Sequence, residues 1–361
     1  MSFYSLVRPL VFKLDPEKAH NLALSFLKFL PKTARLFCSK KEYKSLKTSV
    51  LGLSFDNPIG LSAGFDKNAE AILSLQNFGF GFIECGTTTP KAQIGNELPR
   101  IFRLEKDKAI INCLGFNNLG AEVFAENITK SLPNLTTNLG INIGKNKETT
   151  NALDDYLPLL KKFYLDANYI TINISSPNTK NLRDLQNEDN LDEFLEKIML
   201  CKKELIAQHN KKDTPIFLKI APDLSEKEQE NIAKAVLKNQ FDGVIISNTT
   251  IDRNLGLQSK NITQAGGLSG KPLFEKSNQV LKNFYQLTNG KVVLIGVGGI
   301  SNASDAYEKI KLGASLVQIY SGFIYEGFGL VEKIKKDLDL LLKKDGFDNI
   351  SQAIGINNKI T

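Results

Sequence analysis

Polar side chains follow strand-like segments at several places in this 361-residue chain. In residues 169–179, isoleucines alternate with Thr171, Asn173 and Ser175 before a Ser-Ser-Pro-Asn-Thr turn. A period of two puts the isoleucines on one face of a strand and the small polar groups on the other. Burying Asn173 without hydrogen-bond partners costs on the order of a few kcal/mol. The pattern therefore favours a ligand at the polar face of this strand.

Two other strand-like segments carry a polar residue between apolar ones. Asn142 lies between two isoleucines, and Lys219 lies between a leucine and an isoleucine on the face shared with Phe217. A buried, inward-facing lysine needs an anionic or electron-rich partner, because burial otherwise lowers its pKa. The alternative is a lysine that extends to the rim of the fold.

Glycine-rich segments lie near the end of the pattern, at residues 265–272, 296–301 and 320–322. Glycines expose backbone N–H groups, and a following helix adds a favourable dipole for an anion. Phosphate bound by the loops after the last two strands is a recurrent arrangement in (β/α)8 barrels. These segments therefore predict a phosphate-bearing ligand.

The elements that must position these residues alternate between strand-like and helical patterns. Helical patterns cover 191–208 and 226–238, the second preceded by the capping pair Ser225 and Glu228. The strand-like segments are 57–65, 80–89, 138–146, 169–179, 214–222, 241–250, 291–299 and 314–322. Eight such alternations without a domain-scale linker predict an α/β fold, a (β/α)8 TIM barrel with its chemistry at the carboxyl ends of the strands. The long gap at 90–137 predicts an insertion that roofs the site.

Composition restricts the class of protein. The chain is 42% hydrophobic and 24% charged, typical of a globular enzyme. Its net charge of +7 comes from residues 1–47, which carry ten Lys and Arg and three acidic residues. Residues 48–361 have no net charge, which argues against nucleic-acid binding. Four scattered cysteines indicate reduced thiols, and two distant histidines argue against a zinc site. We expect neither a membrane-spanning helix nor a signal peptide.

Residues 1–47 have an amphipathic helical pattern. Asp15, Pro16 and Glu17 are typical of a helix start, and Pro31 is expected to end the helix before a short basic segment at 32–44. The apolar stripe consists of Ala19, Leu22, Ala23, Phe26, Leu27 and Leu30. Two interpretations are open: a helical pair packed on the barrel, or an anchor whose apolar face enters a membrane surface with lysines on anionic head groups.

Together these segments resemble the dihydroorotate dehydrogenases, the FMN enzymes of pyrimidine synthesis. The motifs are SAGFDKN (62–68), ECGTTTPK (84–91), GNELPRIFRL (95–104), NCLGFNN (112–118), GINIGKN (140–146), YITINISSPNT (169–179), LKIAPD (218–223), SNTTIDR (247–253), GGLSGKPL (266–273), GVGGI (296–300) and IYSG (319–322). The basic N-terminal segment, with LDPEKAHNLAL (14–24), resembles the membrane-associated class that uses a quinone.

The resemblance implies roles for individual residues. The FMN-binding set would be Ala63, Gly64, Thr87, Asn142, Asn173, Lys219, Ser247, Gly270, Gly299, Tyr320 and Ser321. The set around dihydroorotate and its product orotate would be Lys67, Asn112, Gly115, Phe116, Asn173, Asn178, Asn248 and Thr249. A lysine and several amides suit a carboxylate and a pyrimidine ring.

Ser176 would be the catalytic base, removing a proton from C5 while a hydride leaves C6 for the flavin. The soluble class has cysteine at this position, so the serine agrees with the N-terminal segment in implying the quinone-dependent class. Ubiquinone or menaquinone would enter between the N-terminal helices, with Arg103 and Tyr320 at its head and Leu22 and Phe26 at its tail. His20 is expected to be a packing or tunnel-side residue.

The expected organisation follows from the same resemblance. Residues 1–47 would be a membrane-association and quinone-entry segment, residues 48–340 the FMN-binding barrel, and residues 341–361 a C-terminal tail. The protein would be peripheral, on the cytoplasmic face of the inner membrane in a bacterial cell. One departure from the family is Cys113, where arginine is usual, which puts a local salt bridge in doubt.

Two other functions are compatible with the same residues. A non-redox barrel, such as an aldolase with Lys219 as a Schiff-base lysine, would use the phosphate loops for its substrate. A flavin enzyme acting on another pyrimidine would use the N-terminal helices only for packing.

Overall fold

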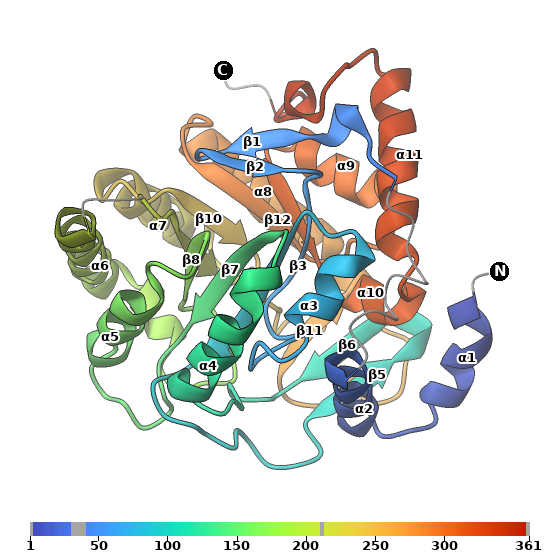
Figure 1. Ribbon diagram of the computed structural model, residues 1–361, viewed down its shortest axis with the longest axis horizontal. Coiled ribbons are helices and arrows are strands. Elements are labelled where there is room, and N and C mark those ends of the chain that lie inside the picture. The colour runs from blue at the N-terminus through green and yellow to red at the C-terminus, as the bar shows by residue number, and fades with distance from the viewer. Residues whose placement is uncertain (1–2, 30–40, 210–212, 359–361) are drawn as a thin grey trace.

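Eight parallel strands close into a barrel at the centre of the computed structural model, which describes residues 3–29, 41–209 and 213–358 (Figure 1). In barrel order from the first strand, they are β3 (Ile59–Leu61), β4 (Phe82–Thr88), β7 (Asn138–Ile143), β8 (Tyr169–Asn173), β9 (Ile216–Ile220), β10 (Gly243–Ile246), β12 (Val293–Val297) and β13 (Leu316–Ile319). Each predicted strand segment contains one of them, so the predicted TIM barrel is confirmed. The strands are shorter than the segments because the polar ends of the segments form the loops at the barrel mouth.

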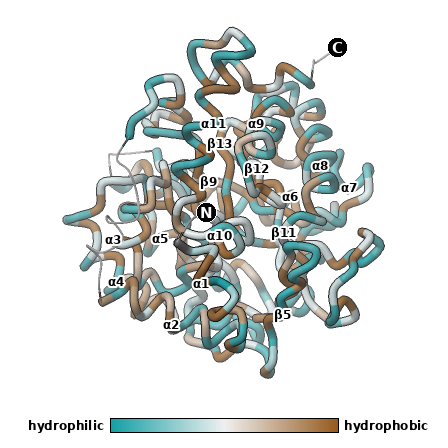
Figure 2. The backbone as a smooth tube through the Cα atoms, turned by 90° about the vertical axis from the view of Figure 1, so that its right-hand side faces the viewer, coloured by the Kyte–Doolittle hydropathy of each residue, from teal (hydrophilic) through white to brown (hydrophobic). Residues whose placement is uncertain are grey.

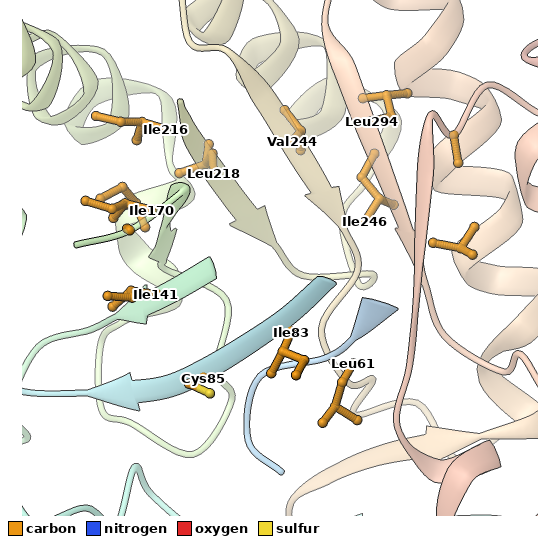
Figure 3. Packing of buried hydrophobic residues seen from close by; sticks show 14 of the residues in the cluster. Leu61, Ile83, Cys85, Ile141, Ile170, Ile216, Leu218, Val244, Ile246 and Leu294 are labelled. Atoms are coloured by element: carbon orange, nitrogen blue, oxygen red, sulfur yellow. The ribbon is translucent and has the colours of Figure 1, made fainter. Parts of the chain in front are cut away.

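The alternation in β8 has the predicted consequence for packing. Ile170 and Ile172 are fully buried between the strands and the outer helices, where each contributes about 2 kcal/mol of burial. Figure 3 shows Leu61, Ile83, Ile141 and Ile170 on successive strands of this outer core. The opposite face of β8 lies inside the barrel and ends at Asn173.

The barrel interior is filled by aromatic side chains below the site. The ring of Tyr169 lies 5.3 Å from that of Phe217 and 6.1 Å from that of Phe82. A hairpin of β1 (Thr48–Val50) and β2 (Leu53–Phe55) adds Phe55 to this cluster. The lower barrel is therefore a packed core, and any ligand must bind above it.

Helices cover the outside of the barrel (Figure 1). They are α3 (Ile72–Leu75), α4 (Ala121–Ser131), α5 (Leu153–Phe163), α6 (Glu188–His209), α7 (Glu226–Lys238), α8 (Phe274–Leu287), α9 (Ala303–Lys311), α10 (Ser321–Glu326) and α11 (Leu330–Lys344). Helix α7 has the predicted bounds and the predicted capping box between Ser225 and Glu228. The expected C-terminal tail starts at residue 341, inside α11, and Ile350 in the later 3₁₀ turn η8 (Ile350–Ala353) is buried.

A second, antiparallel sheet lies beyond the barrel mouth. It consists of β5 (Ile101–Leu104), β6 (Ala109–Asn112) and β11 (Gly267–Gly270), in the order β11-β6-β5. The first two strands belong to the predicted insertion at 90–137. The third lies within the glycine-rich segment 265–272, for which no strand was predicted, and it pairs with β6.

The N-terminal helices α1 (Phe3–Val11) and α2 (Pro16–Phe29) pack beside this small sheet and α10 (Figure 1). Asp15 Oδ1 accepts the backbone N–H groups of Glu17 and Lys18, which confirms the predicted helix start. The Tyr4 hydroxyl donates to the carbonyl of Ile324 over 2.7 Å and anchors α1. Leu30, Pro31 and most of the basic segment at 32–44 lie outside the described residues.

Candidate active site

A polar cavity lies at the carboxyl ends of the barrel strands. Of the residues predicted for the flavin and substrate sites, it brings together Ala63, Gly64, Lys67, Thr87, Asn112, Gly115, Phe116, Asn173, Ser176, Asn178, Lys219, Ser247, Asn248, Thr249, Gly270, Gly299, Tyr320 and Ser321. These residues come from distant parts of the sequence, and they meet because parallel strands place all their carboxyl ends on one side of the barrel.

Asn142 differs from the other predicted residues because it does not line this cavity. Its Oδ1 accepts a hydrogen bond from Thr87 Oγ1 over 2.6 Å, and its Nδ2 donates to Glu84 Oε1 over 2.7 Å. Its amide is thus used inside the barrel, where it supports the cavity floor from below.

Asn173 is satisfied by protein groups. Its Nδ2 donates to Thr87 Oγ1 over 3.0 Å, and its Oδ1 accepts from Ser175 Oγ over 2.8 Å. The sequence pattern predicts a ligand that satisfies this buried amide, but neighbouring side chains already form its hydrogen bonds. The network fixes the Asn173 amide at the cavity floor instead.

Lys219, which lines the cavity, forms a buried charge pair with Glu84, which lies outside the lining. Lys219 Nζ lies 3.9 Å from Glu84 Oε1 and donates to Ser62 Oγ over 3.4 Å. Burial lowers the pKa of Lys219, while the nearby Glu84 carboxylate opposes that shift. Lys219 is 4% exposed, so it does not extend to the rim.

Glu84 itself was not among the predicted site residues. Its fully buried carboxylate accepts hydrogen bonds from the Tyr169 hydroxyl over 2.9 Å and from Gln318 Nε2 over 2.6 Å. Its inward position, two residues after Phe82 in β4, was the available signal.

The loops after β8 and β6 hold each other in place at the cavity wall. Asn178 Nδ2 donates to the backbone carbonyl of Asn112 over 3.1 Å. The backbone N–H of Asn178 donates to Ser176 Oγ over 3.2 Å. Ser175, by contrast, does not line the cavity, because its side chain bonds to Asn173 and accepts from Asn248.

Lys67 is a second lysine in the cavity lining. Burial lowers the pKa of Lys67 to about 8, and the carboxylate of Glu17 on α2 opposes this shift. The ammonium group therefore lies in a site where it retains much of its charge at neutral pH and is available to an anionic ligand.

The loops after β12 and β13 approach their neighbours too closely for a side chain. A Cβ at Gly299, where φ is +77°, would lie 2.5 Å from the Cβ of Phe274. A Cβ at Gly322 would lie 2.2 Å from the backbone oxygen of Ile300. Gly299, Gly322 and Ser321 all line the cavity, and the anion site at these loops stays a prediction.

A second cavity of about 420 Å³ lies between the N-terminal helices, the small sheet and α10. Its lining is largely apolar and includes Val7, Val11, Ala19, Ala23, Ile101, Phe323 and Phe328, with Arg103, His20 and Tyr320 as polar members. Four residues line both cavities: Asn112, Leu114, Ser269 and Tyr320. The two cavities are therefore neighbours separated by a thin wall of side chains.

Arg103 and His20 have defined positions in the second cavity. The Arg103 guanidinium donates to the carbonyls of Phe12 and Leu14 over 3.1 Å and 2.8 Å. The His20 ring packs edge-on against Phe65 with centroids 5.1 Å apart, and burial lowers its pKa to about 4. His20 is thus a neutral residue on the cavity side, as predicted.

Leu22 and Phe26 are not part of this cavity, which corrects their predicted place at a quinone tail. They are 63% and 47% exposed, whereas Ala19 and Ala23 line the cavity and Leu27 is buried. The apolar stripe of α2 is wider than the cavity, so its outer edge faces away from the barrel. Figure 2 views the molecule from this side, with hydrophobic residues along α1 and α2.

No helix within residues 3–29, 41–209 and 213–358 is long and apolar enough to cross a membrane. No group of three or more His, Cys, Asp and Glu side chains within the same ranges is arranged to hold a metal ion.

Comparisons with known proteins give a consistent result. The sequence profile of the family described as dihydroorotate dehydrogenase matches residues 45–342. The chain is 48% identical to a dihydroorotate dehydrogenase (quinone) of Idiomarina loihiensis over 93% of its length and 100% of that protein. It is 47% identical to the same enzyme of Bartonella tribocorum, over 97% of this chain and 96% of that one.

Solved structures agree with the sequence comparisons. The crystal structure of dihydroorotate dehydrogenase from Eimeria tenella in complex with ferulenol superposes with a TM-score of 0.90 at 40% identity, covering 96% of both chains. The ligand-free form of the same protein gives a TM-score of 0.89.

Proposed function

Because the chain belongs to the dihydroorotate dehydrogenase family, in its quinone-dependent class 2, we propose that its polar cavity binds dihydroorotate beside FMN and that its apolar cavity admits the quinone. The enzyme oxidises dihydroorotate in pyrimidine biosynthesis and passes the electrons to a quinone. The observation that supports this division is the pair of adjoining cavities, one polar and one apolar, with Tyr320 in the wall of both.

The family uses a flavin, and FMN is the form that fits these residues. Gly299 and Gly322 line the cavity at positions where a side chain would clash with Phe274 and Ile300, so backbone groups face the cavity there, as a phosphate site requires. The phosphate end is completed by Gly270, Tyr320 and Ser321. The ring end is surrounded by Ala63, Gly64, Thr87, Asn173, Lys219 and Ser247. Asn142 supports the ring end from below through its hydrogen bond with Thr87. When bound, FMN supplies the acceptor for the hydride of dihydroorotate and the electron donor to the quinone.

Dihydroorotate is bound by one cation and several amides. Lys67 pairs with its carboxylate, since a partly buried ammonium group interacts strongly with an anion. Gly115 and Phe116 shape the wall that excludes water. The groups that hydrogen-bond the pyrimidine ring are Asn112, Asn173, Asn178, Asn248 and Thr249.

Ser176 Oγ removes the proton from C5 of dihydroorotate. A serine hydroxyl is a weak base at its ordinary pKa, so the group needs help in this role. The backbone N–H of Asn178 donates to Ser176 Oγ and favours its deprotonated form. The hydroxyl must first give up its own proton to solvent, and the C5 proton then neutralises the oxygen. The loop after β8 therefore orients the base and stabilises the negative charge that Ser176 Oγ carries between these two transfers.

The quinone, ubiquinone or menaquinone, occupies the apolar cavity with its head at Arg103 and Tyr320 and its tail along Ala19 and Ala23. Residues 1–47 serve membrane association and quinone entry, and residues 48–340 form the catalytic barrel. The protein binds peripherally, at the cytoplasmic face of the inner membrane in a bacterial cell. The exposed Leu6, Leu10, Leu22 and Phe29 supply the apolar surface for this contact.

Flavin content and half-reaction test the proposal together. Purified protein should release FMN, identified by chromatography after denaturation, in a ratio near one per chain. Anaerobic dihydroorotate should then bleach the flavin absorbance. A protein that purifies colourless and takes up no added FMN would refute the flavin assignment and favour the non-redox barrel.

A further inference from the structure

An ion pair joins the first turn of α2 to the chain just before β5. Arg100 Nε and Nη2 donate to both carboxylate oxygens of Glu17, over 2.7 to 3.2 Å. The side chains are 11% and 15% exposed, so solvent screens this pair less than a surface pair. It is thus a firm attachment between the N-terminal helices and the roof of the active site.

Arg100 passes this attachment on to the substrate loops. Its Nη1 donates to the carbonyls of Ile94 and Asn96, over 2.6 Å and 2.8 Å. Asn96 Nδ2 in turn donates to the carbonyls of Cys113 and Asn178, over 2.9 Å and 3.3 Å. Cys113 directly follows Asn112, which also accepts from Asn178. A continuous series of hydrogen bonds therefore runs from α2 to Asn178 and Asn112, two residues assigned above to the dihydroorotate site.

The same pair also determines the charge near Lys67. Glu17 raises the pKa of Lys67 and Arg100 lowers it, against a larger effect of burial. His20 on α2 also interacts electrostatically with Lys67. The carboxylate of the neighbouring Asp66 accepts the N–H groups of residues 70 and 71. His20 is neutral at pH 7 because its pKa is about 4, so it does not replace Glu17.

We propose that Glu17 is a positioning residue for dihydroorotate: through Arg100 and Asn96 it holds Asn178 and residues 112–113 in place. The charge of Lys67 gives a second readout, because the Glu17 carboxylate favours the charged form of that lysine. This inference rests on the function proposed above for the polar cavity. It makes the N-terminal helices part of the dihydroorotate site as well as of the quinone site.

Two substitutions separate this role from simple structural support. Glu17→Gln and Arg100→Gln break the same ion pair, so both should weaken orotate binding to the flavin-loaded enzyme by about tenfold. Their effects on the pH dependence should be opposite. Orotate affinity in the wild type should fall as the pH rises through the Lys67 pKa of about 8. That midpoint should move to lower pH in Glu17→Gln and to higher pH in Arg100→Gln.

Calorimetric titration of orotate between pH 6.5 and 9.5, together with the KM for each substrate, measures these effects. The KM for dihydroorotate should rise in both variants, with a much smaller change in the KM for the quinone. Lys28→Met is the matched control, because the pair of Lys28 with Glu70 also ties α2 to the barrel and has no hydrogen-bonded link to Asn96. It should leave the orotate titration unchanged. Glu17→Asp, which keeps the charge, should retain the wild-type midpoint.

The possible outcomes distinguish the inference from the proposed function. Midpoints that do not move, or that move in the same direction in Glu17→Gln and Arg100→Gln, would overturn the inference while the wild type still binds orotate. An equal loss of affinity in Lys28→Met would also overturn it, because general loosening of α2 would then be the cause. A wild-type enzyme that binds no orotate would overturn the proposed function, and the inference with it.

Discussion

Ser175 and Ser176 are adjacent in sequence and differ completely in their surroundings. Ser175 is fully buried and hydrogen-bonded to Asn173, whereas Ser176 lines the cavity with its Oγ accepting the N–H of Asn178. The alternation in β8 alone does not distinguish the two serines. Their hydrogen bonds do, and they support Ser176 as the residue whose oxygen faces the substrate.

Replacing Ser176 with alanine should slow flavin reduction by dihydroorotate by about 10²–10⁴-fold, the usual contribution of a general base. FMN should remain bound, because the flavin-facing groups are unchanged. Anaerobic stopped-flow absorbance measures the rate. Ser175→Ala is the matched control and should lose far less activity. Wild-type reduction rates in Ser176→Ala would rule out its role as the base.

The buried carboxylate of Glu84 should matter for stability. Replacing it with glutamine leaves the Lys219 ammonium without its charge partner inside the barrel. We expect the free energy of unfolding to fall by about 3 kcal/mol, since breaking a buried ion pair leaves an uncompensated charge. Urea unfolding at saturating FMN measures this. The double variant Glu84→Gln/Lys219→Met should recover part of the loss; an additive loss in the double variant would contradict the pairing.

At the scale of elements, the barrel was predictable because its signal is local. Alternating apolar residues fix the outward face of each strand, and all eight predicted segments contain a barrel strand. The strand β11 was missed because its glycine-rich sequence resembles a loop, and its pairing with β6 depends on contacts more than 150 residues apart. Glu84 was missed for a similar reason, since its partners lie on other strands.

The N-terminal helix α2 shows where periodicity is insufficient. Helical periodicity predicts which residues lie on the apolar face of a helix. The width of the surface that packs against the helix decides which of those residues are buried. Ala19 and Ala23 line the apolar cavity, while Leu22 and Phe26 lie outside it. The small residues of the stripe, not the large ones, therefore leave the space that the quinone is proposed to fill.

Filling that space should separate the two half-reactions. Ala23→Phe places a ring in the apolar cavity. The ring takes up volume that the quinone needs, so the quinone loses contacts with the cavity wall. The KM for the quinone should therefore rise by about tenfold or more. Reduction of the flavin by dihydroorotate should be unchanged, because Ala23 does not line the polar cavity. Leu22→Phe, one residue away and exposed, is the control. Normal quinone kinetics in Ala23→Phe would contradict the assignment of this cavity.

For the whole molecule, charge and apolar exposure coincide at one end of the chain. Residues 1–47 hold the entire net charge of +7, and α1 and α2 expose four large apolar side chains at 63% or more, Leu6, Leu10, Leu22 and Phe29. Basic residues near an anionic surface contribute about 1 kcal/mol each. The two helices that line the apolar cavity therefore carry both features that the proposed membrane contact requires.

Removing apolar side chains from this side should weaken membrane binding. Leu22→Ser/Phe29→Ser should reduce co-sedimentation with vesicles of mixed neutral and anionic lipids at low salt, without loss of flavin. Leu340→Ser on α11 is the matched control, because Leu340 is 56% exposed on another part of the molecule. Equal binding by the double variant and the wild type would show that α1 and α2 do not form the membrane contact proposed here.

The two adjoining cavities predict electron transfer from dihydroorotate to a quinone within one protein. Steady-state oxidation of dihydroorotate should be measured with a short-chain ubiquinone or menaquinone, and in parallel with NAD⁺ and with fumarate. We predict rapid orotate formation with a quinone and little with the other two acceptors. Turnover with NAD⁺ or fumarate, but not with either quinone, would contradict the account.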